Sequence, residues 1–454
     1  MEEVEHFLST VSNYVWGYPA VFLLLGTHIF LTFRLHFIQR FICTALKLSI
    51  SRPEKEHGDI SHFASLMTAL AATVGTGNII GVATAVLLGG PGAVFWMWLT
   101  GIFGFATKYS EAVLSIRYRT RNEKGEFVGG PMYVLEKGLH SKLLGILFSV
   151  FTVIASFGIG NMVQSNALSQ TVADSFHIPP ILTGIVVAFF TGLVIIGGIK
   201  SIARVCELLV PFMAIFYLCG CLGILIINYR NVPHALVLIF TSAFTGHAAF
   251  GGFLGAGVRE AIRYGVSRGL FSNEAGLGSA PIVAAAAKTK HPVQQALVSA
   301  TGTFWDTVVI CFITGLSLVS SEGWHQSSSP VEIVRFTWNS YPLIGPILLT
   351  IALLTFVYST ILGWSYYGEK AWEYLFSRKS TIIYRILWVI AVFLGANIKL
   401  NIVWTLADIA NALMAIPNLI SLILLTPVII YETKDYFTPS IPDHDILSEV
   451  IIKK

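Results

Sequence analysis

The residues best suited to chemistry are the small and polar ones that interrupt an apolar segment near residue 75. Gly75, Thr76, Gly77 and Asn78 lie in the middle of a stretch from about 65 to 88 that is otherwise apolar. A helix in lipid must satisfy its own backbone groups, because the bilayer offers no partner for a freed N–H or C=O. Glycines two residues apart do not share one helical face, so close helix packing explains them poorly. The pattern therefore predicts a broken transmembrane helix.

An interrupted helix can bind a zwitterion without a charged side chain. The N–H groups opened at one end attract a carboxylate, and the C=O groups opened at the other attract an ammonium group or a cation. A second interruption follows at 271–279, with the sequence Phe-Ser-Asn-Glu-Ala-Gly-Leu-Gly-Ser. Paired interruptions are typical of the binding site of an inverted-repeat transporter. We therefore expect a small zwitterionic substrate between the two.

Two carboxylates lie at membrane depth, where they are costly and usually functional or paired. Asp306, in the middle of an apolar segment, could coordinate a cation or tie a neighbouring helix through hydrogen bonds. Glu274, within the second interruption, could pair with Arg268 or serve the function directly. The sequence leaves both alternatives open for both residues.

Neutral polar residues elsewhere could complete the site. Gln164 could donate to a substrate carboxylate or bond to a neighbouring helix. Ser359 and Thr360 offer hydroxyl oxygens that suit an alkali cation, although mid-helix hydroxyls normally bond to their own helix. Trp364 follows Thr360 by four residues and shares its helical face, so it could wall a small pocket or simply pack against a neighbour or lipid.

The composition requires a membrane protein. Of the 454 residues, 54% are hydrophobic and 12% are charged, whereas about 25% are charged in an average soluble protein. The acidic N-terminus lacks the features of a signal peptide, so we expect the first apolar segment to remain in the mature protein. The five cysteines show no metal-ligand spacing and are expected to act as small buried hydrophobes. No enzyme signature or nucleic-acid module appears.

About eleven segments reach the roughly 20 apolar residues that a transmembrane helix needs. They lie at 14–36, 63–88, 93–117, 144–173, 180–199, 206–228, 252–288, 294–319, 344–376, 382–397 and 401–430. The segment 234–250 is expected to form an outer amphipathic helix or part of the seventh span. The fold class is therefore an all-α polytopic protein of the cell membrane.

The basic residues predict an orientation. If the helices alternate, the loops on one side collect most of them, at Arg34, Arg40, Lys47, Arg52, Lys55, Arg117, Arg119, Arg121, Lys124, Lys137, Lys142, Lys200, Arg204, Lys288, Lys290, Lys370, Arg378 and Lys379. Cytoplasmic loops are rich in Lys and Arg, so the N-terminus is expected outside and the C-terminus in the cytoplasm. Arg259, Arg263 and Arg268 conflict with this scheme and are interpreted as facing an aqueous vestibule.

An internal repeat is visible once the first span is set aside. The next five helices and the last five form two halves of opposite orientation, because five is odd, and each half opens with an interrupted span. We expect an extra N-terminal helix and loop at 1–62, a first five-helix repeat at 63–230, a second, inverted one at 231–430, and a cytoplasmic tail at 431–454.

Several longer motifs resemble the alanine or glycine:cation symporter family over nearly the whole chain, from about 16 to 427. They are Thr68–Ile79, Gly89–Ala93, Lys108–Ala112, Gly129–Tyr133 and Gly269–Pro281. The resemblance implies a fold similar to that of the bacterial leucine transporter, behind one extra helix. It also implies sodium-coupled symport of alanine or glycine by alternating access, with sodium as a transported ion and no cofactor.

The resemblance also implies roles for single residues. Residues Thr73 to Asn78 would cradle the substrate carboxylate and ions, with Gln164 beside them. The second interruption would contribute Phe271, Ser272, Asn273 and Gly276. Ser359 and Thr360 would match the sodium-site hydroxyls of the fold, with Thr73, Asn78 and Asp306 as further sodium ligands, and Trp364 would limit the size of the substrate side chain.

Other readings stay open at this point. The coupling ion could be a proton or another cation, carried by Asp306 or Glu274, and the solute could be another small neutral amino acid. A channel or sensor on the same scaffold is the alternative from another class, which the paired interruptions disfavour. The sequence does not decide among alanine, glycine and serine, and it leaves ion stoichiometry and oligomeric state open.

Overall fold

Helices make up nearly all of the computed structural model, which describes residues 2–15, 17–51, 57–245, 257–325, 327–398 and 401–438. The elements are α1 (Glu2–Val15), α2 (Tyr18–Arg34), η1 (Ile38–Phe41), α3 (Ile42–Ser49), α4 (His62–Thr73), η2 (Gly77–Gly81), α5 (Val82–Gly89), α6 (Gly92–Arg117), β1 (Thr120–Arg121), β2 (Phe127–Val128), α7 (Pro131–Lys137), α8 (Lys142–Phe157), η3 (Gly158–Met162), α9 (Val163–Phe176), α10 (Pro180–Ile196), α11 (Gly198–Ile227), α12 (Val232–Ser242), α13 (Val258–Asn273), α14 (Pro281–Ala284), α15 (Pro292–Thr303), η4 (Phe304–Cys311), α16 (Phe312–Ser320), η5 (Gly323–His325), α17 (Pro330–Trp338), α18 (Gly345–Phe376), η6 (Arg378–Ser380), α19 (Thr381–Asn397), α20 (Asn401–Leu424) and α21 (Thr426–Phe437).

Helices lie in all eleven apolar segments that the sequence predicts. Within the described residues, six helices are long and apolar enough to cross a membrane, and up to eight if two bent pairs each count as one span. α6 adds 26 residues that carry Lys108 and Glu111. Large apolar side chains cover the outside of α10, α11 and α19, as suits helices that face hydrocarbon. The all-α multi-span prediction is confirmed.

The first predicted interruption separates α4 from the π-helical turn η2. α4 ends at Thr73, Val74 is extended, and helical structure resumes at Gly77. The segment Gly77–Gly89 is bent by 56° relative to α4. The turn passes close to α18: a Cβ at Gly75 would lie 2.6 Å from Oγ1 of Thr360. Only glycine fits at this contact, which explains why a helix-weakening residue stands there.

The second interruption is larger than the sequence suggests. α13 ends at Asn273, and Glu274, Gly276 and Gly278 all have positive φ, at 55°, 89° and 84°. Only the four-residue α14 follows before the chain reaches α15. The helix of the predicted span at 252–288 thus stops within the predicted interruption at 271–279, because three left-handed residues end it, and little helix follows before residue 288. Its first residues, 252–256, lie outside the described part of the chain, as does most of 243–250 beyond α12.

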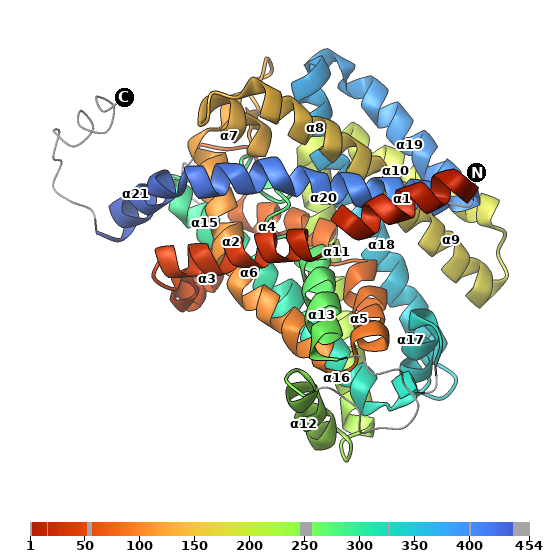
Figure 1. The fold of residues 1–454 in the computed structure, drawn as a ribbon. Coiled ribbons are helices and arrows are strands. Elements are labelled where there is room, and N and C mark those ends of the chain that lie inside the picture. The colour runs from red at the N-terminus through yellow and green to blue at the C-terminus, as the bar shows by residue number, and fades with distance from the viewer. Residues whose placement is uncertain are drawn as a thin grey trace.

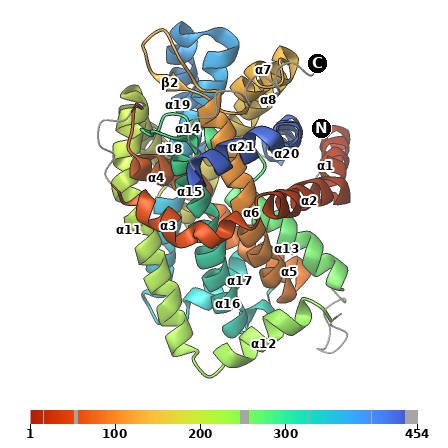
Figure 2. The same ribbon diagram turned by 90° about the vertical axis from the view of Figure 1, so that its left-hand side faces the viewer.

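α6 lies near the centre of the molecule, beside α13 and α15, and the views in Figures 1 and 2 agree on this. Two glycines of α13 allow its closest contact with α6. A Cβ at Gly265 would collide with the carbonyl oxygen of Ala93, and one at Gly269 with the hydroxyl of Thr100. The backbones of the two helices therefore touch along two turns.

Some elements and positions were not predicted. α1 precedes the first span and packs along α20. α21 covers residues 426–437, where the last span was expected to end and the tail to begin. Residues 439–454 lie outside the described residues. Cys43 and Cys219 are exposed, whereas the other three cysteines are buried as expected. β1 and β2 form a short antiparallel hairpin. In Figure 2 this hairpin lies at the opposite end of the molecule from α12, α16 and α17.

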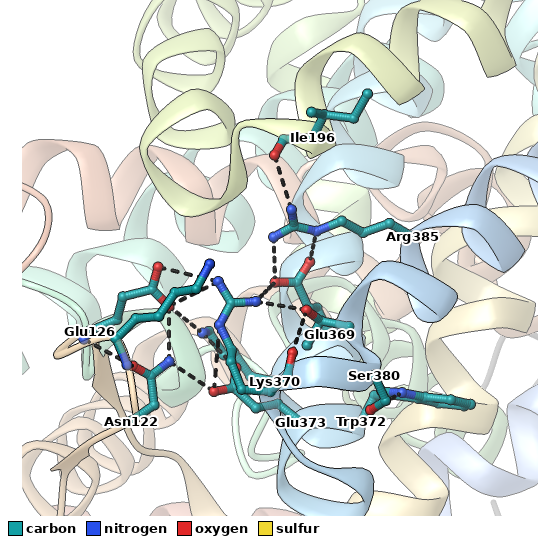
Figure 3. A network of polar contacts seen from close by, with 12 residues as sticks. Asn122, Glu126, Ile196, Glu369, Lys370, Trp372, Glu373, Ser380 and Arg385 are labelled. Atoms are coloured by element: carbon teal, nitrogen blue, oxygen red, sulfur yellow. Dashed lines mark hydrogen bonds and ion pairs between the residues drawn. The ribbon is translucent and has the colours of Figure 1, made fainter.

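Charged residues hold the hairpin to α18 and η6 (Figure 3). Glu126 pairs with Lys370 at 3.5 Å and with Arg378 at 3.4 Å, and Asn122 donates to Glu373 at 2.8 Å. Partial burial of Glu126 favours its neutral form. The hydrogen bond from Asn122 and the two cations outweigh burial, however, and lower the pKa of the Glu126 carboxyl below its ordinary value. The loop is thus held by charge at neutral pH.

Candidate substrate and ion site

A small cavity lies between the two interruptions. We call it the central pocket, and its volume is about 20 Å³. It is lined by Ala72, Thr73, Gly75, Thr76, Gly77, Ile159, Gln164, Phe271, Glu274, Thr360, Trp364 and Asn411. That volume has room for about one water, so the pocket must widen before an amino acid can enter it.

One wall of the central pocket is backbone. Gly75, Thr76 and Gly77 connect the C-terminus of α4 to the start of η2, and the first N–H groups of a helix lack partners within it. The N–H of Gly75 donates to Oδ1 of Asn78 at 2.9 Å. The hydroxyl of Thr73 bonds back to the carbonyl of Ala69 at 3.3 Å. This wall carries the partial positive charge of a helix N-terminus.

Another part of the pocket wall offers acceptors. Oε1 of Gln164 and Oδ1 of Asn411 are buried and have no hydrogen-bond partner among the described residues, and Glu274 adds a carboxylate. The amide nitrogen of Gln164 already donates to the carbonyl of Ile159 at 3.0 Å. Buried acceptors without a donor are costly, so this wall is suited to an ammonium group. The sequence had suggested a donor role for Gln164 instead.

A buried carboxylate cluster lies next to the pocket and joins both interruptions. Asp306, on the π-helical segment η4, accepts from Nδ2 of Asn78 at 2.7 Å and from the hydroxyls of Ser272 at 2.9 Å and Thr307 at 2.7 Å. Cys311 lies 3.3 Å from Asn78 and from Ser272. Carboxylate, amide and hydroxyl oxygens are the ligands that hard cations take in proteins.

Aromatic side chains close the pocket. Trp364 is only 2% exposed, and Gly160 packs so closely that a Cβ there would collide with its indole. Phe271 also lines the pocket and packs against Gly77. Both hydroxyls of the Ser359–Thr360 pair bond back to the carbonyl of Phe356, at 2.8 and 2.9 Å. Thr360 lines the pocket, whereas Ser359 lies behind it in the helix.

Two residues of the second interruption make other contacts. Oδ1 of Asn273 accepts from the N–H of Ala275 at 3.0 Å, and its amide nitrogen lies 3.4 Å from Thr100. The N–H of Gly276 donates to Glu111 at 3.0 Å. These contacts direct both residues toward α6 rather than into the central pocket.

The structure thus sorts the residues singled out in the sequence into three groups. Those that line the central pocket are Thr73, Gly75, Thr76, Gly77, Gln164, Phe271, Thr360 and Trp364. Those beside it in the carboxylate cluster are Asn78, Ser272 and Asp306. Those that contact neither are Asn273, Gly276 and Ser359.

Sequence reasoning missed several lining residues. Asn411 and Ile159 belong to segments that look like ordinary apolar spans, so the sequence carried no clear signal for either residue. Thr307 directly follows Asp306, and that adjacency was a usable signal. Glu274 was noted as ionisable and suggested as a partner of Arg268, but its carboxylate instead accepts from the hydroxyl of Ser279 and lines the pocket.

Comparisons with known proteins agree on the kind of molecule. Residues 1–445 match the model of the sodium:alanine symporter family. The chain is 52% identical over 440 residues to the sodium/alanine symporter AgcS of Methanococcus maripaludis, covering 94% of this chain and 96% of that one. It is 36% identical over 435 residues to the amino-acid carrier protein AlsT of Bacillus subtilis, covering 94% and 90%.

The fold is shared with solved transporter structures. The crystal structure of MhsT in complex with L-phenylalanine superposes with a TM-score of 0.59 at 15% sequence identity, covering 83% of this chain and 98% of that one. At this identity the likeness concerns the fold alone, and it confirms the predicted leucine-transporter-like architecture.

Proposed function

This chain belongs to the sodium:alanine symporter family, and we propose that its central pocket binds alanine while the adjacent carboxylate cluster binds the sodium ion that drives uptake. The observation that carries the proposal is the polarity of the pocket. Backbone at the start of η2 lines part of the pocket, and the unpaired side-chain acceptors of Gln164 and Asn411 line another part. A zwitterion satisfies both parts at once.

The geometry supports one orientation of the substrate. The carboxylate faces the backbone of Gly75 to Gly77, where a helix N-terminus favours negative charge. The ammonium group faces Gln164, Asn411 and Glu274, which accept its three protons. The side chain then points at the aromatic wall of Phe271 and Trp364, which limits its size to that of a methyl group or a hydrogen in this proposal. Glycine is therefore a second substrate in this proposal.

Asp306 is the proposed anchor for sodium. Its carboxylate is buried and already surrounded by the hydroxyls of Ser272 and Thr307, so a cation there replaces donor contacts with oxygen ligation. Asn78, which contacts Asp306 directly, is the first further candidate ligand. Thr73 and Thr360 line the adjacent pocket, whereas the hydroxyl of Ser359 bonds within its own helix. Asn78 touches both Asp306 and the pocket backbone, which gives the two ligands a shared side chain.

The transport cycle proposed is alternating access. The two five-helix halves, 63–230 and 231–430, enclose the site, and one element rocks so that the occupied site opens to the cytoplasm. We place the N-terminus outside and the tail inside, as the loop charges favour. An inward sodium ion gains about 2.3 kcal/mol per 100 mV of membrane potential, in addition to its concentration gradient, which suffices to concentrate a small solute.

Uptake into proteoliposomes tests the proposal. Labelled alanine should accumulate when sodium is high outside, and not when sodium is equal on both sides or is replaced by potassium. A proton gradient without sodium serves as the alternative coupling ion. Accumulation driven by protons alone would replace sodium as the coupling ion, and equal accumulation in all conditions would overturn symport.

A further inference from the structure

α6 carries two buried charges that the proposed transport cycle does not use. Lys108 and Glu111 are each 2% exposed, and they lie three residues apart, so they share one face of the helix. Charges in such a position are costly unless they are paired and hydrogen-bonded. Their partners should therefore reveal what they do.

Both residues bind the second interruption rather than each other. Oε1 of Glu111 accepts from the N–H groups of Gly276 and Gly278, both at 3.0 Å, and from the amide of Asn418 at 2.7 Å. Nζ of Lys108 donates to the carbonyl of Asn273, the last residue of α13. The carboxylate thus covers freed N–H groups, and the ammonium covers the C-terminal end of a helix.

Glu111 and Lys108 thus supply the negative and the positive charge that a transported anion and cation would otherwise bring to these backbone groups. A helix C-terminus attracts a cation, and a turn of successive N–H groups attracts an anion. At the second interruption both attractions are already met by side chains from α6. At the first interruption the backbone of Gly75 to Gly77 lines the central pocket instead.

Lys108 also places a fixed positive charge among buried carboxylates. Its ammonium group donates to the carbonyl of Asn273, and the hydroxyl of the preceding residue, Ser272, donates to Asp306 at 2.9 Å, so the lysine lies near the proposed sodium site. A fixed positive charge near Asp306 weakens sodium binding, and a fixed negative charge strengthens it. The occupancy of Asp306 should therefore respond to both members of the α6 pair.

We propose that Lys108 is a tethered cation and Glu111 its matched anion, which together hold the second interruption without any transported ligand and set the sodium affinity at Asp306. Both are positioning residues, because neither lines the central pocket. The inference rests on the proposed sodium-coupled uptake. It leaves the first interruption and Asp306 as the places where substrate and sodium bind.

The test compares Lys108→Met, Glu111→Gln and the double variant in proteoliposomes. Methionine keeps the length of the lysine without its charge, and glutamine keeps an oxygen for the two N–H groups. The measurement is the sodium concentration that gives half-maximal alanine uptake. We expect Lys108→Met to lower it and Glu111→Gln to raise it, each by about tenfold, and the double variant to return toward wild type.

The opposite signs distinguish this proposal from a purely structural role. If both single variants raise the half-saturating sodium concentration, or if the double variant is worse than either, the proposal is wrong. Size-exclusion profiles in detergent show whether each variant is folded, and a double variant that folds better than Lys108→Met also supports the pairing. Lys124→Met and Glu123→Gln, which are exposed on the hairpin loop, are matched controls and should shift nothing.

Failure of the underlying function looks different. If wild-type protein takes up alanine without sodium, the proposed function fails before any variant is compared. If wild-type uptake is sodium-driven and the two single variants shift in the same direction, only the role of the α6 pair is overturned.

Discussion

The side-chain amide of Asn78 bridges the two parts of the site: its nitrogen donates to Asp306 at 2.7 Å, and its oxygen accepts from the N–H of Gly75 at 2.9 Å. A cation at Asp306 needs oxygen ligands, so it favours the opposite orientation of this amide. That rotation would release the N–H of Gly75 toward the central pocket, where a substrate carboxylate can accept it. One side chain thereby links sodium to alanine.

Replacing Asn78 with alanine should weaken both ligands. The variant loses the contact to Asp306 and the contact to Gly75 together, and a hydrogen bond to a charged group contributes about 1.5–3 kcal/mol. We expect the half-saturating concentrations of sodium and alanine each to rise at least about tenfold in uptake assays. Asn397→Ala, at an exposed side chain that donates to the carbonyl of Phe393 in its own helix, is the control. Loss of alanine affinity with unchanged sodium dependence would exclude the bridge.

Replacing Asp306 with asparagine should act first on sodium. The change keeps the size of the side chain and removes the buried charge that attracts the cation. On the same scale we expect the half-saturating sodium concentration to rise about ten- to hundredfold, with a smaller effect on alanine at saturating sodium. Asp435→Asn makes the same change on exposed α21. Normal sodium dependence in Asp306→Asn would remove this residue from the ion site.

Replacing Gln164 with alanine should act on alanine alone. The variant removes an acceptor that has no partner in the pocket, and it leaves Asp306 and its neighbours in place. We expect the alanine concentration for half-maximal uptake to rise about tenfold while sodium dependence stays unchanged. Exposed Gln170→Ala is the matched control. A parallel rise in the sodium requirement would mean that the two sites are not separable at this residue.

Shortening the aromatic wall should broaden the range of substrates. Trp364→Leu and Phe271→Leu each open space where the substrate side chain points, without introducing a polar group. Competition against labelled alanine is the measurement, and we expect valine and leucine to compete in the variants but not in the wild type. Trp305→Leu, at a tryptophan that is 37% exposed, should leave the selectivity intact. Unchanged selectivity in both pocket variants would place the size limit elsewhere.

The hairpin contact should give a pH-dependent contribution to stability. The pKa of Glu126 is lowered in the folded protein, so the carboxylate stabilises the fold above its ordinary value of 4.5, and the contribution disappears as the pH falls through the folded pKa. We expect Glu126→Gln to unfold at a lower temperature than wild type at pH 7. The difference should shrink below about pH 4.5 and correspond to less than about 1 kcal/mol, because the site is partly exposed. A difference that is independent of pH would contradict the charge pairing.

The fold was predictable wherever apolar length decides the structure. The interruption near Gly75 was found because its glycines lie two residues apart within an apolar span. Glycines at that spacing do not share one helical face, so helix packing does not explain them. The π-helical turns at η3 and η4 were not, since they depend on packing against neighbours and carry no local signature. The hairpin of β1 and β2 was missed for a similar reason: its two-residue strands are held by contacts to α18 that lie some 250 residues away.

The site was predictable at the level of segments and less so for single atoms. Thr73 to Gly77, Gln164 and Trp364 do meet around one cavity, but Gly276 and Asn273 turn toward α6. Lys108 and Glu111 lie in the sequence motif Lys108–Ala112, but their charges were not singled out from the sequence. Which backbone groups they would contact depends on the left-handed turns after α13, which sequence patterns do not encode.

The bare contact of α6 with α13 at Gly265 and Gly269 limits how the protein can change shape. Two helices whose backbones are in contact cannot easily slide past each other, because sliding would bring main-chain atoms into collision. We therefore expect the motion that opens the site to carry α6 and α13 together. A larger residue at Gly265 or Gly269 should therefore block transport even where the protein still folds and binds alanine.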